Sequence, residues 1–180
     1  MADIEIATWE ENILSESSYN KIADAIRGTK YGVQLVNILD KAIVIITILI
    51  YGIILLMQLI SASYAQLYKY ILIPAAGFLV VSVFRYLYNQ PRPYQELDIN
   101  PILKKDTQGK SFPSRHVYSI FIIAMTALQY NVVLGILLLI FGTILAVVRV
   151  VGGAHFPRDV FAGGLLGVVT GLLGYYMIMI

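Results

Sequence analysis

The sequence predicts an all-α protein, a polytopic membrane helix bundle with about five transmembrane helices and an amphipathic helical segment before them. The chain is strongly apolar: 58% of its 180 residues are hydrophobic and 13% are charged, with a mean hydropathy of +0.76. The charges are also segregated, and residues 42–68, 70–84, 117–148 and 160–180 contain none. Long uncharged runs are typical of helices that cross a bilayer, where every backbone polar group must be hydrogen-bonded internally.

Composition narrows the function classes further. The chain contains no cysteine, which excludes disulfides, thiol chemistry and cysteine-ligated metals. We expect no signal peptide, because the first apolar run begins only at residue 42 and no small-residue cleavage site follows it. The expected surroundings are the lipid bilayer, with no nucleic acid partner. Two parts are predicted: residues 1–40 at the membrane surface and residues 41–180 as the bundle.

The N-terminal part has the pattern of amphipathic surface helices. Thr8-Trp9-Glu10-Glu11 has the spacing of a capping box. Apolar residues recur at helical spacing from Tyr19 through Ile22 and Ala23 to Ile26, and Gly28 is placed to end that helix. Anchoring or packing is the favoured role for this segment, with substrate access as the alternative.

The first span is predicted from about Lys41 to Ile60 and the second from about Leu67 to Tyr88. Pro74 is expected to kink the second span, and Pro91 and Pro93 follow its end. Residues 89–113 then form a loop long enough to favour a functional role. The remaining spans are predicted at about 114–128, 131–148 and 159–180. In the last of them Gly163, Gly167 and Gly171 recur every four residues, which is typical of close helix packing.

Five spans place several polar side chains from separate segments on one membrane face, the N-terminal one. These residues are Arg85, Arg92, Ser114, His116, Arg149, His155 and Asp159. Ionisable groups at a membrane boundary are costly and usually mark function. Helix capping and snorkelling would explain each of these residues taken alone. They would not explain why all of the residues fall on the same membrane face.

The segment Arg149-Val-Val-Gly-Gly-Ala-His155-Phe-Pro-Arg-Asp159 carries most of the expected chemistry. Pro157 fits the first turn of a helix, so His155 lies at or just before the N-cap and Asp159 lies in the first turn. A carboxylate that holds one imidazole nitrogen leaves the other free as a base or nucleophile. The planar guanidinium group of Arg149 is suited to bind phosphate or carboxylate oxygens.

Three arginines around one point favour phosphate, since each guanidinium can bind two oxygens. The helix that Ser114 opens adds free backbone N–H groups and a favourable dipole. Two histidines beside one phosphate suggest that His155 attacks phosphorus while His116 protonates the leaving oxygen. The candidate catalytic residues are therefore His155, His116 and Asp159. No metal and no cofactor is expected, because the arginines already supply positive charge.

These residues resemble the motifs of the type 2 phosphatidic acid phosphatases, which share their site architecture with vanadium haloperoxidases. The family has three motifs. The first is a lysine followed, after six residues of any type, by Arg-Pro, and the second is Pro-Ser-Gly-His. The third is Ser-Arg, then five residues of any type, a histidine, three residues of any type and an aspartate. The matching segments are Arg85 to Pro93, Pro113-Ser114-Arg115-His116, and Arg149 to Asp159. The resemblance implies a phosphohistidine on His155, His116 as general acid, Asp159 as the group that orients His155, and phosphate binding by Arg85, Arg92, Ser114 and Arg149.

Three positions depart from the family pattern. Arg85 replaces a lysine, which keeps the charge and changes the geometry. Arg115 replaces the glycine, and it either contacts substrate or points to water. Val148 replaces the serine before Arg149 and removes a hydroxyl.

The expected function is an integral membrane lipid phosphatase. Phosphatidic acid, phosphatidylglycerophosphate and isoprenoid diphosphates all present a terminal phosphate on an apolar body. A non-catalytic protein that binds or transports a lipid phosphate in the same basic pocket is the alternative. The expected location is a bacterial-type cytoplasmic membrane with the site at the outer face, as the family implies. Every Lys and Arg except Lys69 falls on the site face, which by the positive-inside rule favours the opposite orientation.

Overall fold

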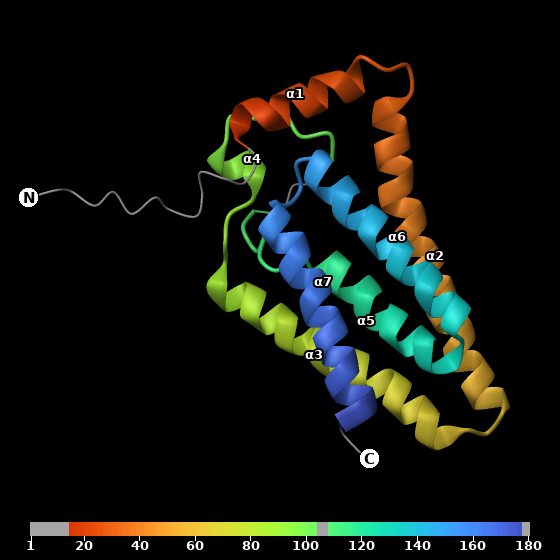
Figure 1. The fold of residues 1–180 in the computed structure, drawn as a ribbon. Coiled ribbons are helices and arrows are strands. Elements are labelled where there is room, and N and C mark those ends of the chain that lie inside the picture. The colour runs from red at the N-terminus through yellow and green to blue at the C-terminus, as the bar shows by residue number, and fades with distance from the viewer. Residues whose placement is uncertain (1–14, 104–107, 178–180) are drawn as a thin grey trace, which may run out of the picture.

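A computed structural model describes residues 15–103 and 108–177 of the chain, and every regular element in this part is helical (Figure 1). The elements in chain order are α1 (Glu16–Arg27), α2 (Gly32–Ile60), α3 (Tyr64–Tyr88), α4 (Pro93–Glu96), α5 (Arg115–Tyr130), α6 (Val132–Val151), α7 (Pro157–Leu172) and the π-helical turn η1 (Leu173–Met177). The predicted all-α membrane bundle is confirmed.

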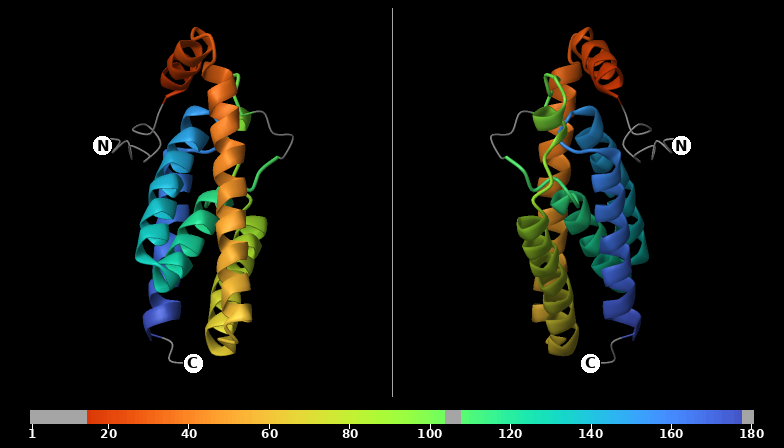
Figure 2. Two further views of the ribbon diagram at one scale, coloured as in Figure 1. Left: turned by 90° about the vertical axis from the view of Figure 1, so that its right-hand side faces the viewer. Right: turned by 90° about the vertical axis from the view of Figure 1, so that its left-hand side faces the viewer.

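Helix α5 lies at the centre of the bundle. Helices α2 and α3 meet at the connection 61–63 and diverge from there, with α5 inside the V that they form (Figure 1). Helices α6 and α7 pack on α5 from the other side (Figure 2). Buried apolar side chains of α5, such as Ile120 and Ile122, contact the surrounding helices and form the core between them.

In the described part of the chain, four helical stretches are long and apolar enough to cross a membrane: Gly32–Ile60, Tyr64–Glu96, Val132–Val151 and Pro157–Met177. The remaining predicted span, the third one at about 114–128, corresponds to α5, which has 16 residues. Because α5 is enclosed by the other helices, its length need not match the thickness of the hydrocarbon core.

The first spanning helix begins at Gly32, earlier than the sequence predicted from the charged pair Asp40-Lys41. The helix continues through this pair because Lys41 is exposed, whereas the buried Asp40 meets a cation of α6. Gly28 caps the end of α1 as expected. The capping-box pattern at residues 8–11 lies outside the described residues.

The glycine stripe of α7 packs directly on α5. A Cβ atom added at Gly163 would lie 2.5 Å from the carbonyl oxygen of Ser114, and one at Gly171 would lie 2.4 Å from Cβ of Met125. A Cβ atom added at Gly167 would lie 2.7 Å from Cβ of Phe121 and 2.9 Å from the carbonyl oxygen of Tyr118. The stripe thus brings the start of α7 against the start of α5.

Candidate active site

The turn between α6 and α7 presents His155 by a local mechanism that the sequence predicted. Gly152 caps α6, and Gly153 has φ of 72°, a conformation that favours glycine. The backbone N–H groups of Ala154 and His155 then donate to the carbonyl of Arg149, at 3.0 and 3.2 Å. Phe156 is the N-cap of α7 and Pro157 its first residue, so His155 lies just before the helix.

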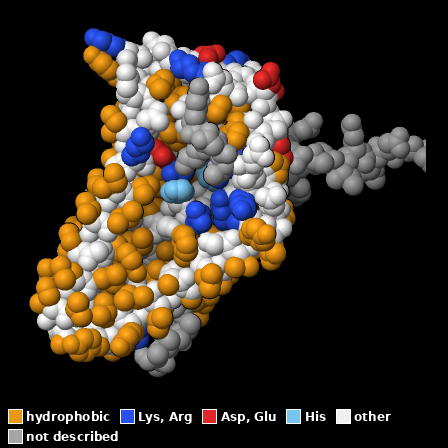
Figure 3. Space-filling view, turned by 180° about the vertical axis from the view of Figure 1, so that it is seen from behind, with side chains coloured by type: hydrophobic (Ala, Val, Ile, Leu, Met, Phe, Trp, Pro, Cys, Tyr) orange, Lys and Arg blue, Asp and Glu red, His pale blue; other side chains and the backbone are white. Residues whose placement is uncertain are grey.

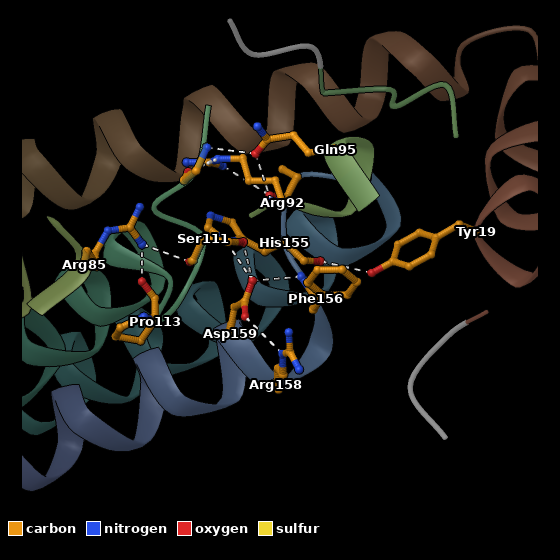
Figure 4. A network of polar contacts seen from close by, with 12 residues as sticks. Tyr19, Arg85, Arg92, Gln95, Ser111, Pro113, His155, Phe156, Arg158 and Asp159 are labelled. Atoms are coloured by element: carbon orange, nitrogen blue, oxygen red, sulfur yellow. Dashed lines mark hydrogen bonds and ion pairs between the residues drawn. The ribbon is translucent and has the colours of Figure 1, made fainter. Parts of the chain in front are cut away.

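The carboxylate of Asp159 holds the His155 ring in place (Figure 4). Oδ2 of Asp159 lies 3.4 Å from Nδ1 of His155 and accepts the N–H of Phe156 at 3.1 Å. The Ser111 hydroxyl donates to the same oxygen at 2.5 Å and lies 3.3 Å from Nδ1. With Nδ1 directed at this acceptor, Nε2 of His155 is left to act as a nucleophile or base.

Burial favours the neutral form of the His155 imidazole. The ring is 1% exposed, and desolvation lowers its pKa from 6.5 to about 4. The nearby charges of Arg92 and Arg149 act in the same direction, against an opposing contribution from Asp159. A neutral imidazole is the form that can attack phosphorus.

Two of the predicted phosphate-binding arginines also hold backbone loops of the site. The guanidinium of Arg85 donates from Nη1 to the carbonyls of Ser111, at 3.0 Å, and Pro113. Arg92 donates from Nε to the carbonyl of Gly109 at 3.1 Å and from Nη1 to that of Ala154 at 3.2 Å. Both side chains are buried, so their charges lie within the site rather than in solvent.

Arg149 is the most deeply buried of the three and is paired with a carboxylate. Its Nε lies 2.6 Å from Oδ1 of Asp40 on α2. Arg149 is 1% exposed and Asp40 is 9% exposed. The ion pair fixes one edge of the guanidinium and joins the first spanning helix to the end of α6.

Buried polar atoms without a hydrogen-bond partner in the described part of the chain mark a place for an anion. They include Nη1 of Arg149 and Oγ of Ser114. Ser114 is the N-cap of α5 but makes no side-chain capping bond, which leaves the first-turn N–H groups of α5 to a ligand. Unpaired buried donors are costly, and a phosphate group with several oxygens would satisfy this set.

His116 and Arg115 follow Ser114 at the start of α5 and lie at an apolar groove. Both line this groove, whose volume is about 830 Å³. The His116 side chain is half-buried and that of Arg115 is exposed. On the surface, histidine and basic side chains gather at one end of a broad hydrophobic face (Figure 3).

The groove runs between α2 and α3 over α5. Its walls include Ile48 and Tyr51 of α2 and Phe78 and Leu79 of α3, and Ile123 of α5 contributes to its floor. Ile48, Phe78 and Leu79 are strongly exposed, as suits side chains that face lipid. The arrangement suits an apolar chain that lies in the membrane with its polar head at His116.

Helix α1 packs against the site instead of lying apart from it. The Tyr19 hydroxyl donates to the backbone carbonyl of His155 at 3.2 Å, and burial is the main reason that its pKa is raised. Ala23 joins the apolar cluster around Ala154. A packing role for the N-terminal segment was the favoured interpretation, and these contacts agree with it.

The structure brings together most of the predicted residues. Ser111 connects Arg85 to the pair of His155 and Asp159, and Arg92 reaches the turn before His155.

Sequence reasoning missed Ser111, Asp40 and Tyr19. An acidic residue just before a long apolar run was a usable signal for Asp40. The sequence around Ser111 and Tyr19 contained no comparable signal. Among the described residues, no group of three or more His, Asp or Glu side chains is placed to hold a metal ion.

The chain is similar to several known proteins. Undecaprenyl-diphosphatase BcrC of Bacillus subtilis (strain 168) is 28% identical over 144 residues, 76% of this chain and 74% of that protein. Bacitracin transport permease protein BcrC of Bacillus licheniformis is 30% identical over 91 residues, 50% of this chain and 44% of that protein. The crystal structure of Aquifex aeolicus LpxE has the same fold, with a TM-score of 0.70 at 22% identity over 92% of this chain and 97% of that one. The PAP2 superfamily model matches residues 66–179, and the chain therefore belongs to the PAP2 superfamily.

Proposed function

We propose that this protein is an integral membrane lipid phosphatase that removes a terminal phosphate through a phosphohistidine on His155. One observation carries the proposal. A buried imidazole whose pKa is lowered by desolvation is oriented by Asp159, the buried donors Arg149 Nη1 and Ser114 Oγ lack partners in the described part of the chain, and Arg115 and His116 line an apolar groove. A site built only to hold a head group would not require an oriented neutral nucleophile among cations.

In the first step, Nε2 of His155 attacks the terminal phosphorus. The bond between this phosphorus and the leaving oxygen breaks, and its electron pair stays on that oxygen, which takes a proton from His116. Asp159 stabilises the positive charge that the imidazole acquires. Arg92, Arg149 and the first turn of α5 bind the non-bridging oxygens of the transferring group; Arg85 is assigned the same role from its charge.

In the second step, water replaces His155 on phosphorus. His116, now deprotonated, takes a proton from the water as its oxygen attacks. The phosphorus–nitrogen bond breaks, its electron pair returns to His155, and inorganic phosphate leaves. All groups in this scheme belong to the chain, so activity without added metal ions is expected.

The groove indicates a lipid with a long apolar tail and a head at the level of His116. A relative that is named an undecaprenyl-diphosphatase favours isoprenoid diphosphates over phosphatidic acid and phosphatidylglycerophosphate as the substrate. The outer face of a bacterial-type cytoplasmic membrane remains the proposed location of the site. Because the chain contains no cysteine, one cysteine introduced at position 98 and tested with an impermeant thiol reagent in intact cells would report its side.

Binding or transport of a lipid phosphate without hydrolysis is the second candidate, since another relative is named a transport permease. The two functions differ in whether phosphate is released. The purified protein in detergent with EDTA should release phosphate from a lipid diphosphate, and His155→Ala should release none while keeping its helix content. Binding of the lipid without release by the wild type would favour the second candidate.

A further inference from the structure

Arg115 opens α5 and lines the apolar groove beside His116. We propose that Arg115 binds the inner phosphate of a lipid diphosphate and thereby makes the site selective for lipid diphosphates over lipid monophosphates. The inference rests on the proposed function and adds a specificity residue to it.

The placement of Arg115 supports this role. It is the first residue of α5, between the buried Ser114 and the half-buried His116. Its guanidinium carbon lies 5.3 Å from the centre of the Phe78 ring on α3. The residue lines the groove together with His116. A cation is thus held over the groove wall where the groove meets the phosphate site.

The charge of Arg115 is available to a ligand. Among the described residues, it makes no ion pair with a carboxylate. The buried arginines are already engaged by the protein: Arg149 pairs with Asp40, and Arg85 and Arg92 donate to backbone carbonyls. A terminal phosphate brings roughly two negative charges, and a second phosphate needs a cation beyond this buried set.

The order of groups in the substrate places the second phosphate at Arg115. With His155 on one side of the terminal phosphorus, the leaving oxygen lies on the opposite side, next to His116 and the groove. In a diphosphate this oxygen bridges to the inner phosphate. When the terminal bond breaks, its electron pair passes to a lipid monophosphate, whose added charge a guanidinium stabilises. A lipid monophosphate releases an alcohol instead, which offers Arg115 no second anion.

The test compares farnesyl diphosphate with farnesyl monophosphate on the full-length protein in detergent, so that the tail is the same in both. Arg115→Ala should lower kcat/KM on the diphosphate roughly 10- to 100-fold, the effect of one lost charge-assisted contact to a developing charge, and on the monophosphate less than about 3-fold. Arg115→Lys should restore much of the diphosphate activity, and Arg115→Gln should not.

Lys110→Ala is the matched control. Lys110 is also exposed and lies 4.9 Å over an aromatic ring, that of Tyr86, so its removal tests general attraction of anions. The ratio of the two kcat/KM values should stay unchanged in this variant.

An unchanged ratio of the two kcat/KM values in Arg115→Ala, through an equal loss on both substrates or no loss on either, would overturn the inference. Activity on the monophosphate, measured in the same sample, shows that the variant is folded. Release of phosphate from neither substrate by the wild type would instead overturn the proposed function, and the inference with it.

Discussion

Asp40 and Arg149 form an ion pair between α2 and α6, with 2.6 Å between Oδ1 and Nε. Both residues are buried, so neither charge is solvated by bulk water. The pair holds one edge of the guanidinium and leaves Nη1 without a protein partner in the described part of the chain. Asp40 is therefore a positioning residue for the arginine that we assign to the phosphate.

Asp40→Ala should destabilise the protein and weaken phosphate binding. Removal of one partner from a buried ion pair costs about 3–5 kcal/mol, because the remaining cation stays buried and unpaired. Inorganic phosphate should supply part of the missing charge, so it should raise the melting temperature of Asp40→Ala more than that of the wild type. Thermal unfolding in detergent, with and without phosphate, measures both effects.

Asp24→Ala provides the matched control, because Asp24 is exposed and pairs with Arg27 at 3.3 Å. Surface pairs contribute little, and this variant should unfold as the wild type does. An equal phosphate effect in all three proteins would contradict a role for Asp40 in positioning Arg149 for an oxyanion.

Ser111→Ala should lower kcat with little change in KM. The Ser111 hydroxyl donates to the oxygen of Asp159 that faces His155. A hydrogen bond to a charged group contributes about 1.5–3 kcal/mol, which corresponds to a rate effect of roughly 10- to 100-fold. Because Ser111 acts through Asp159, the same substitution should have little effect in an Asp159→Asn background.

Steady-state kinetics of the two single variants and the double variant test this dependence. Ser63→Ala serves as a control at the far end of the bundle, where Ser63 makes no capping hydrogen bond. Fully additive losses would contradict the proposal that Ser111 works through the carboxylate.

The segment from Arg149 to Asp159 could be predicted because its interactions are local. A glycine pair ends α6, a proline starts α7, and the carboxylate reaches back three and four residues, to Phe156 and His155. The start of α5 at Ser114 follows from the same kind of signal. The apolar runs likewise fixed the helix class and, to within a few residues, most of the spans.

The partners of these residues could not be predicted, because they depend on how distant helices pack. Asp40 looked like the boundary of the first span, and only the meeting of α2 with α6 makes it the partner of Arg149. Tyr19 belonged to an ordinary apolar stripe, and the backbone group it meets is that of His155. Ser111 lies two residues before the motif Pro113-Ser114-Arg115-His116 and belongs to no motif itself.

The His155 imidazole should be neutral in the free protein across the physiological range. Burial lowers its pKa to about 4, so the folded protein should protonate this ring only well below the 6.5 of an ordinary histidine. The chain contains two histidines, and His116→Gln leaves one. Nuclear magnetic resonance of ¹⁵N-histidine in this variant should show a neutral ring from pH 8 down to about 5.

The same spectrum identifies the protonated nitrogen, which should be Nδ1, because that atom faces Asp159. A titration midpoint near 6.5 would contradict the burial of a neutral nucleophile. A spectrum with the proton on Nε2 would contradict the assignment of the attacking atom.

The central claim is that phosphate is transferred to His155, and rapid-quench labelling tests it most directly. The wild-type protein is mixed with a lipid diphosphate labelled with ³²P in its terminal phosphate, stopped within one turnover and digested. We predict a label that is stable to base and labile to acid, on the peptide that contains His155. The label should form at least as fast as inorganic phosphate is released, and it should be absent from His155→Ala. Release of phosphate with no label on the protein, or with the label on His116, would contradict the account.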